Sequence, residues 1–142
     1  MDKIKVNSQY LKYLHFNILD APKIFFVDSS KPEVDISVRV EGDEYGEKVY
    51  EITLKITAKA HIEQKNQYEL ELHYAALCTI ADDCEKKKLK MMLMVDVPSL
   101  IFPSARSIIS NTTRDANLAS LLLSPINFLK TYQENSQESD QD

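Results

Sequence analysis

The sequence predicts an α+β fold in which an antiparallel, meander-like sheet is followed by a helix that closes over it. Three observations favour this fold. Apolar and polar side chains alternate without a break over residues 34–41, and they alternate again over residues 50–60, which is typical of half-buried strands. Between Val95 and Ser110, two prolines bracket a segment whose apolar residues recur at helical spacing. Strands joined by short connections pair as antiparallel neighbours.

Length and composition indicate one soluble domain. The chain has 142 residues, of which 44% are hydrophobic and 27% charged, as in ordinary globular proteins. A net charge of -5 argues against nucleic acid as a partner, because phosphate binding needs a basic face. No apolar run approaches the ~20 residues of a membrane span, and the N-terminus lacks the apolar core of a secretory signal. We therefore expect a cytoplasmic protein without membrane insertion.

The first strand is predicted over residues 10–19, after a flexible polar N-terminus at residues 1–9. Its two faces are expected to carry Lys12, Leu14, Phe16 and Ile18 on one side, and Tyr13, His15 and Asn17 on the other. Ala21-Pro22 ends the strand, because the residue before a proline is pushed out of regular pairing. The loop at 23–32 then carries four consecutive apolar residues, 24–27. They either plug one end of the core or offer an apolar surface to a partner.

Three further strands are predicted at residues 34–41, 50–60 and 68–80. The first two are joined by an acidic connection, residues 42–46, which holds both glycines of the chain. The last strand alternates until Tyr74 and is then apolar on both faces over residues 75–78. A strand that is apolar on both sides must be covered on both sides there.

The C-terminal half is predicted to be helical. Acidic residues at 82–85 open a helix over residues 86–95. Ser99 is expected to cap the long helix, which runs to about Thr113. The helix places on one face Ile101, Ala105, Ile108 and Thr112. Ser124-Pro125 supplies a cap and a first-turn proline for a last helix, and the acidic residues 133–142 are expected to be disordered.

The residues that carry chemistry do not form a catalytic or metal-binding pattern. Cys78, Cys84, His61 and His73 lack the tight pairing of a zinc site, and no glycine-flanked nucleophile indicates an enzyme. Two glycines do not make a phosphate-binding loop. We therefore expect no metal, no cofactor and no catalysis. A small-ligand module and a self-associating protein with open apolar surface remain, and the methionines at 91–94 favour the second.

Four ordered segments resemble the SecB family of protein-export chaperones over residues 10–132. Residues 97–106 (Val-Pro-Ser-Leu-Ile-Phe-Pro-Ser-Ala-Arg) are similar to the family's Cys-Pro-x-x-Leu-Phe-Pro-x-Ala-Arg segment. Residues 123–128 (Leu-Ser-Pro-Ile-Asn-Phe) are similar to its Leu-Ala-Pro-Val-Asn-Phe segment. Residues 49–54, and Ala21-Pro22 with Phe25, match two further landmarks.

The resemblance implies a four-stranded antiparallel sheet with helices on one side, assembled as a homotetramer that is a dimer of dimers. It implies a chaperone that holds unfolded precursor polypeptides without ATP and passes them to the SecA motor. The groove residues implied by position are Ile24, Phe25, Phe26, Tyr45, Tyr50, Phe128 and Tyr132. The implied oligomer interface contains Leu70, Leu72, Tyr74, Ile101, Ala105 and Ile108.

The SecA-docking surface implied by the resemblance contains Tyr13, Asn17, Glu69 and Glu71. Tyr13 and Asn17 stand where the family has acidic residues, and the family's loop tryptophan and paired glycines are replaced here by Ser30, Ala75 and Ala76. A SecB-like chaperone dedicated to a toxin–antitoxin pair, and a small-ligand binding module, are the alternatives.

Overall fold

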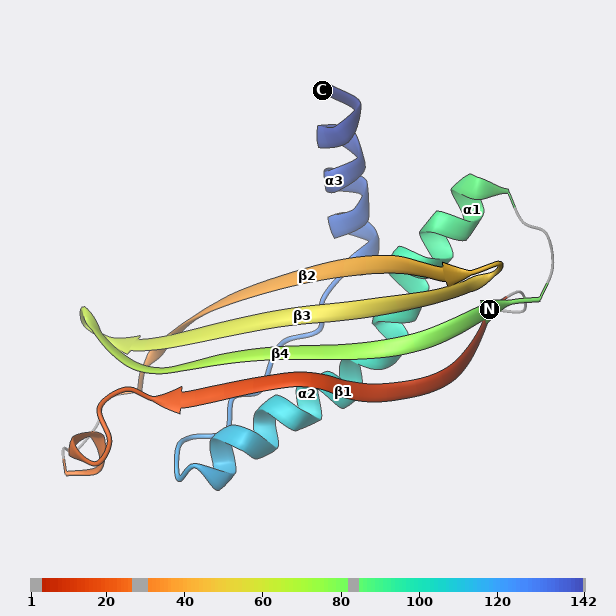
Figure 1. Ribbon diagram of the computed structural model, residues 1–142. Coiled ribbons are helices and arrows are strands. Elements are labelled where there is room, and N and C mark those ends of the chain that lie inside the picture. The colour runs from red at the N-terminus through yellow and green to blue at the C-terminus, as the bar shows by residue number, and fades with distance from the viewer. Residues whose placement is uncertain (1–3, 27–30, 82–84, 142) are drawn as a thin grey trace.

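The chain folds as a sheet followed by helices (Figure 1). A computed structural model describes residues 4–26, 31–81 and 85–141, with side chains as far as Asn135. Two predicted features, Val27 in the apolar loop and the start of the acidic segment 82–85, lie outside the described residues. The elements are β1 (Ile4–Ile18), the 3-10 helix η1 (Lys23–Phe25), β2 (Glu33–Gly46), β3 (Val49–Ile62), β4 (Lys65–Ile80), α1 (Lys86–Met91), the π-helical turn η2 (Met92–Asp96), α2 (Val97–Asp115) and α3 (Phe128–Gln141).

The predicted antiparallel sheet is confirmed. Its strand order is β1-β4-β3-β2, so β2, β3 and β4 form a meander and β1 lies beside β4 at the far edge. The chain therefore crosses from one edge of the sheet to the other between β1 and β2.

All four strands are longer than predicted, β1 and β2 by the most. The expected flexible segment 1–9 contains the start of β1, because Ile4 pairs with Ile80 and continues the apolar alternation. The expected connection at 42–46 belongs to β2, since Gly42 pairs with Ile52 and Gly46 with Val49. The turn lies instead at residues 47–48.

One continuous helix, Lys86–Asp115, replaces the two that were predicted. Ser99 does not cap it; its hydroxyl donates to the Val95 carbonyl at 2.6 Å inside the helix. Pro98 has no amide hydrogen for the preceding turn. The chain accommodates this with η2, in which the Val97 amide donates to the carbonyl of Met92, five residues back.

The helix packs its apolar side on one face of the sheet (Figure 1). Apolar side chains at alternate positions of β3 and β4 point toward α2 and are fully or nearly fully buried. They pack against α2 residues that recur at helical spacing. The core contains Ile52, Leu54, Ile56, Leu70, Leu72, Ile101, Ala105 and Ile109. Each large aliphatic side chain contributes about 1.5–3 kcal/mol by leaving water. The opposite face of the sheet carries no helix in the described part of the chain.

The last helix begins later than predicted and extends further. Asn127 caps it, because its Oδ1 accepts a hydrogen bond from the Lys130 amide at 3.0 Å. Ser124 and Pro125 lie in the preceding irregular segment. The tail that was expected to be disordered from residue 133 has a helical backbone to Gln141, which agrees with the good helix propensity of Gln and Glu.

Within the described residues, the Lys86–Asp115 helix has the length and composition that a membrane span needs. A core helix passes the same test, and 44% of its most apolar window is buried inside the protein. Its apolar side chains, among them Ile101, Ala105 and Ile109, are occupied by contacts with the sheet.

Candidate functional site

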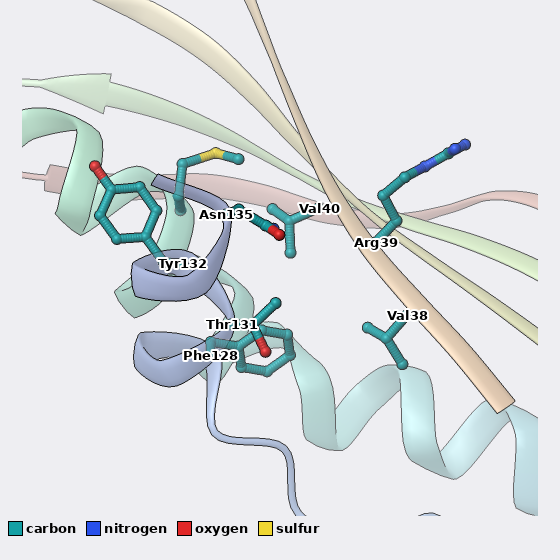
Figure 2. Close-up of a pocket in the computed structure, with 8 residues that line it drawn as sticks. Val38, Arg39, Val40, Phe128, Thr131, Tyr132 and Asn135 are labelled. Carbon is teal, nitrogen blue, oxygen red and sulfur yellow. The ribbon is translucent and has the colours of Figure 1, made fainter. Parts of the chain in front are cut away.

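A small apolar hollow lies between β2, η2 and α3. Its volume is about 80 Å³, and its walls are Val38, Arg39, Val40, Met94, Phe128, Thr131, Tyr132 and Asn135. Figure 2 shows α3 presenting Phe128 and Thr131 toward the side of β2 that carries Val38 and Val40, while Arg39 points away. Phe128 is held in place by an edge contact with Phe102 at 6.0 Å between ring centroids.

A second hollow continues along β2 toward the turn at residues 47–48. It measures about 330 Å³, and its walls are Gly42, Asp43, Glu44, Tyr50, Ile52, Lys90, Leu93 and Met94. A Cβ on Gly42 would lie 3.2 Å from Ile52 Cδ1 and 3.6 Å from the Met94 sulfur. The glycine therefore keeps space open between β2 and η2.

A third hollow lies at the opposite end of the sheet. It also measures about 330 Å³, and it is lined by Ile24, Phe25, Lys31, Pro32, Ile62, Gln67, Tyr68, Asn117, Leu118 and Ala119. Asn117 has a φ of 64°, the left-handed conformation that ends many helices. It ends α2 and turns the chain so that Leu118 and Ala119 form one wall.

The predicted groove residues do not meet in one place. Ile24 and Phe25 line the third hollow, Tyr50 the second, and Phe128 and Tyr132 the first. Tyr50 and Ile62 stand at the two ends of β3, about 40 Å apart at the rise of an extended strand.

Two predicted groove residues, Phe26 and Tyr45, are strongly exposed, at 79% and 64%. The sequence analysis did not identify several residues that line the hollows, among them Val38, Val40 and Met94. The alternation of residues 34–41 and the methionines at 91–94 were the signals for them.

The four predicted docking residues do come together, on the uncovered face. Tyr13 pairs with His73 and Asn17 with Glu69 across β1 and β4, so these side chains share that face with Glu71. Each glutamate contacts an imidazole: His15 Nε2 lies 3.4 Å from Glu69 and His73 Nε2 lies 3.0 Å from Glu71. The Tyr13 and His73 rings are 4.9 Å apart.

The same face also carries cations beside these glutamates. A hollow of about 240 Å³ is lined by Ser37, Arg39, Lys55, Thr57, Glu71 and His73. The Glu41 carboxylate forms ion pairs with Lys55 Nζ at 2.8 Å and with Arg39 Nη2 at 3.2 Å. The hydrogen bond from Lys55 holds the pKa of Glu41 below its ordinary value.

A buried carboxylate links the edge strand β1 to β3 on this face. Glu51 is 6% exposed; Lys12 Nζ donates to it at 2.6 Å, and the Tyr10 hydroxyl donates to its other oxygen. Burial opposes ionisation of Glu51, but these two hydrogen bonds outweigh it and lower its pKa. Burial and the bond to Glu51 raise the pKa of Tyr10 to about 12. Lys12 was expected beside Leu14, but the bulge between Leu11 and Tyr13 lets it reach Glu51.

Most residues predicted for the oligomer interface are core residues of the single chain. Leu70, Leu72, Tyr74, Ile101 and Ala105 are all buried within it, because they lie on the faces where α2 and the sheet meet. Ile108 keeps a partly exposed side chain. Their contact with a second copy stays a prediction.

The described residues that were considered as zinc ligands are Cys78, His61 and His73. No group of three or more His, Cys, Asp or Glu side chains is placed to hold a metal ion among the residues that the structure describes. Cys78 is buried, and burial raises the pKa of its thiol to about 11. His61 contacts Asp35 at 3.3 Å. Cys84 lies outside the described residues.

The sequence matches a known family over nearly its whole length. The family model described as preprotein translocase subunit SecB covers residues 1–139. A protein-export protein SecB of Rhodospirillum rubrum is 35% identical over 127 residues, which are 89% of this chain and 78% of that protein. The SecB of Paramagnetospirillum magneticum is 34% identical over 139 residues, covering 97% of this chain and 88% of that protein.

The fold matches as well. The SecB-like chaperone Rv1957 of Mycobacterium tuberculosis, solved in complex with a ChAD peptide from the HigA1 antitoxin, superposes with a TM-score of 0.73. The two chains are 14% identical, and the match covers 88% of this chain and 92% of the other. At that identity the likeness establishes the four-stranded antiparallel sheet with its helices.

Proposed function

The chain belongs to the SecB family of protein-export chaperones, and from this premise we propose that it keeps non-native precursor polypeptides competent for export without ATP and delivers them to the SecA motor. SecB is a chaperone family and not an enzyme family. We place this activity in the cytoplasm, where precursors are made.

The observation that carries the proposal is a pair of apolar sites along the sheet. One, at one end, contains Phe25 and Leu118. The other begins at Tyr50 near the opposite end and continues past Met94 to Tyr132, beside the middle of β2. Their walls combine aromatic and aliphatic side chains with a few polar ones, so binding depends mainly on apolar area and tolerates many client sequences. The ends of the two sites at Tyr50 and Ile62 are roughly 40 Å apart, a distance that about a dozen residues of extended chain span, which favours unfolded polypeptides over compact ones.

Self-association, as a dimer of dimers, is part of the proposal. Leu11 and Leu14 on the edge strand β1 are exposed at 48% and 38%, and Leu100 on α2 at 46%. β1 also has one side without a neighbouring strand in the sheet. An open edge with apolar side chains favours pairing with another chain.

We further propose that SecA docks on the uncovered face at Glu69 and Glu71. The two carboxylates stand on neighbouring positions of β4 with Tyr13 and Asn17 beside them on β1. The nearby cations Lys55 and Arg39 are paired with Glu41. Glu69 and Glu71 each contact an imidazole, but their side chains remain 40% and 43% exposed and can still meet a basic partner.

Refolding of a denatured protein tests the client-binding part. We expect the native protein to slow the refolding without nucleotide. The double variant Phe25→Ala with Tyr132→Ala is expected to bind the denatured client about tenfold more weakly, because aromatic area is lost at both sites, and so to slow refolding less. Leu122→Ala is the matched control, because Leu122 is 62% exposed and lines neither site. A wild-type protein that leaves refolding unchanged would contradict the proposal.

Direct binding to SecA tests the docking part separately. Glu69→Lys with Glu71→Lys is expected to weaken SecA binding at least tenfold while client binding stays intact. Glu47→Lys, in the exposed turn between β2 and β3, makes the same kind of charge change away from the site. Equal loss of SecA binding in this control would remove the assignment to the uncovered face.

A further inference from the structure

We propose that Met94 is a movable partition between the two hollows along β2, and that an extended apolar client segment displaces it to join them. This inference rests on the proposed chaperone function. Met94 is a wall of both hollows, the one with Phe128 and Tyr132 and the one with Tyr50 and Gly42.

The two hollows follow one another on the same side of the same strand. Val38, Val40 and Gly42 are alternate residues of β2 and pair with Ile56, Leu54 and Ile52 on the covered face. From Val38 to Glu44 the strand rises about 20 Å, which accommodates roughly six residues of extended polypeptide. With Met94 in place, this length is divided into two short pieces.

The local backbone explains why Met94 occupies this position. It lies in η2, where the Val97 amide bonds to Met92 and one extra residue is fitted into the turn. Such π-helical turns redirect the side chains around them and often mark functional positions. Leu93 and Val95 on either side are buried, whereas Met94 is only partly buried.

The side chain and its surroundings both permit movement. Methionine is unbranched, has three rotatable bonds and repacks against varied apolar surfaces. Gly42 faces it across the hollow, and a methyl group there would lie 3.6 Å from the sulfur and 3.2 Å from Ile52. The absence of a side chain at Gly42 therefore leaves the space through which the sulfur can move. Asp43, Glu44 and Lys90 at the open end provide polar groups for a client backbone.

Peptide length is the variable that tests the partition. A four-residue and an eight-residue peptide of alternating Leu, Phe and Ser are titrated by fluorescence anisotropy into the native oligomer. We expect the longer peptide to bind wild type roughly tenfold more tightly, a difference of about 1.4 kcal/mol. Met94→Leu keeps the volume but stiffens the side chain, and Gly42→Ala narrows the opposite wall. Each variant is expected to remove most of this gain, measured as the ratio of the two peptide affinities in the same variant. Met94→Ala is expected to retain the gain.

The control variant is Met91→Leu, because Met91 is 41% exposed and lies in the same helix outside both hollows. The methyl NMR signal of Met94 is expected to report a change of side-chain rotamer with the long peptide, beyond the shift that contact with the short peptide causes. If Met94→Leu and Gly42→Ala still bind the longer peptide about tenfold more tightly than the shorter one, the partition is overturned while the chaperone function stays intact. If the wild-type protein binds neither peptide, both the chaperone function and the partition are overturned.

Discussion

The two faces of the sheet are built from the same four strands but are stabilised in different ways. The covered face carries aliphatic side chains such as Leu54, Ile56 and Leu72, all without exposed area. The uncovered face carries charged and aromatic residues joined in small groups around Glu41, Glu51 and Glu71. Stability therefore resides mainly on the covered face, while charges on the uncovered face can change at little cost to the fold.

The largest effect is expected from a cavity on the covered face. Ile56→Ala removes a fully buried side chain in the middle of β3, and we expect the free energy of unfolding to fall by about 2–5 kcal/mol. Ile36→Ala is the control, because Ile36 lies on the same side of the edge strand β2 but is 44% exposed. Urea unfolding measures both, and an equal loss would show that the covered face is not the main source of stability.

A smaller loss is expected from Glu51, a buried carboxylate of the uncovered face. Glu51→Gln weakens the hydrogen bonds from Tyr10 and Lys12 and leaves Lys12 without its ion partner. We expect a loss of about 1–2 kcal/mol, the range for a buried hydrogen-bonded group, in the same urea experiment. Hydrogen exchange of β1 amides is expected to rise at the same time, because Glu51 ties this edge strand to β3. Unchanged exchange in β1 would contradict that role.

The same cluster predicts a pH dependence with two limbs. The pKa of Glu51 is lowered from 4.5 by Lys12 and Tyr10 despite its burial, so its contribution is complete above pH 4.5 and is lost as pH falls through the folded pKa. The pKa of Tyr10 is raised from 10.0 to about 12, first by burial and then by Glu51. Its contribution is complete below pH 10 and is lost between about 10 and 12.

Tyr10→Phe separates the alkaline limb from general alkaline unfolding. We expect wild type to lose about 1 kcal/mol more than Tyr10→Phe between pH 9 and 12. This is well below the roughly 2.7 kcal/mol that two pKa units would give at 1.36 kcal/mol each, because Tyr10 retains contact with water. Parallel stability curves for the two proteins would show that the Tyr10 hydroxyl contributes nothing there.

The sequence was sufficient where one physical signal dominated. Period-two alternation over residues 34–41 and 50–60 marked two strands and their buried faces, because one side of each strand must leave water. The boundaries were harder. Gly42 and Gly46 suggested a turn, yet ladder hydrogen bonds to β3 keep them in a strand. Ser99 looked like a cap, yet the π-helical turn allows the helix to continue past Pro98.

The candidate site was predicted in part for a similar reason. Phe25, Tyr50 and Tyr132 were identified individually, but residue type does not tell which of them meet, since this depends on how the strands carry them apart. Met94 was missed as a wall because its position follows from the extra residue in η2. Leu70 and Ile101 were assigned to an oligomer interface from the family resemblance. Their burial in the chain's own core was not predicted, because an apolar stripe looks the same whether its own sheet or a second copy covers it.

The smallest effect on stability is expected from Glu41, and here the two faces are most sharply separated. Glu41→Gln removes the partner of Lys55 and Arg39, but exposed ion pairs in water contribute little, so the urea midpoint is expected to stay within experimental error. SecA binding is expected to weaken a few-fold at low salt, because Lys55 and Arg39 then act unneutralised beside Glu71, and to recover at high salt as charges are screened. Ile56→Ala is expected to show the opposite pattern, with lower stability and unchanged SecA affinity while it remains folded. A large stability loss in Glu41→Gln, or unchanged SecA affinity at low salt, would contradict this division between the faces.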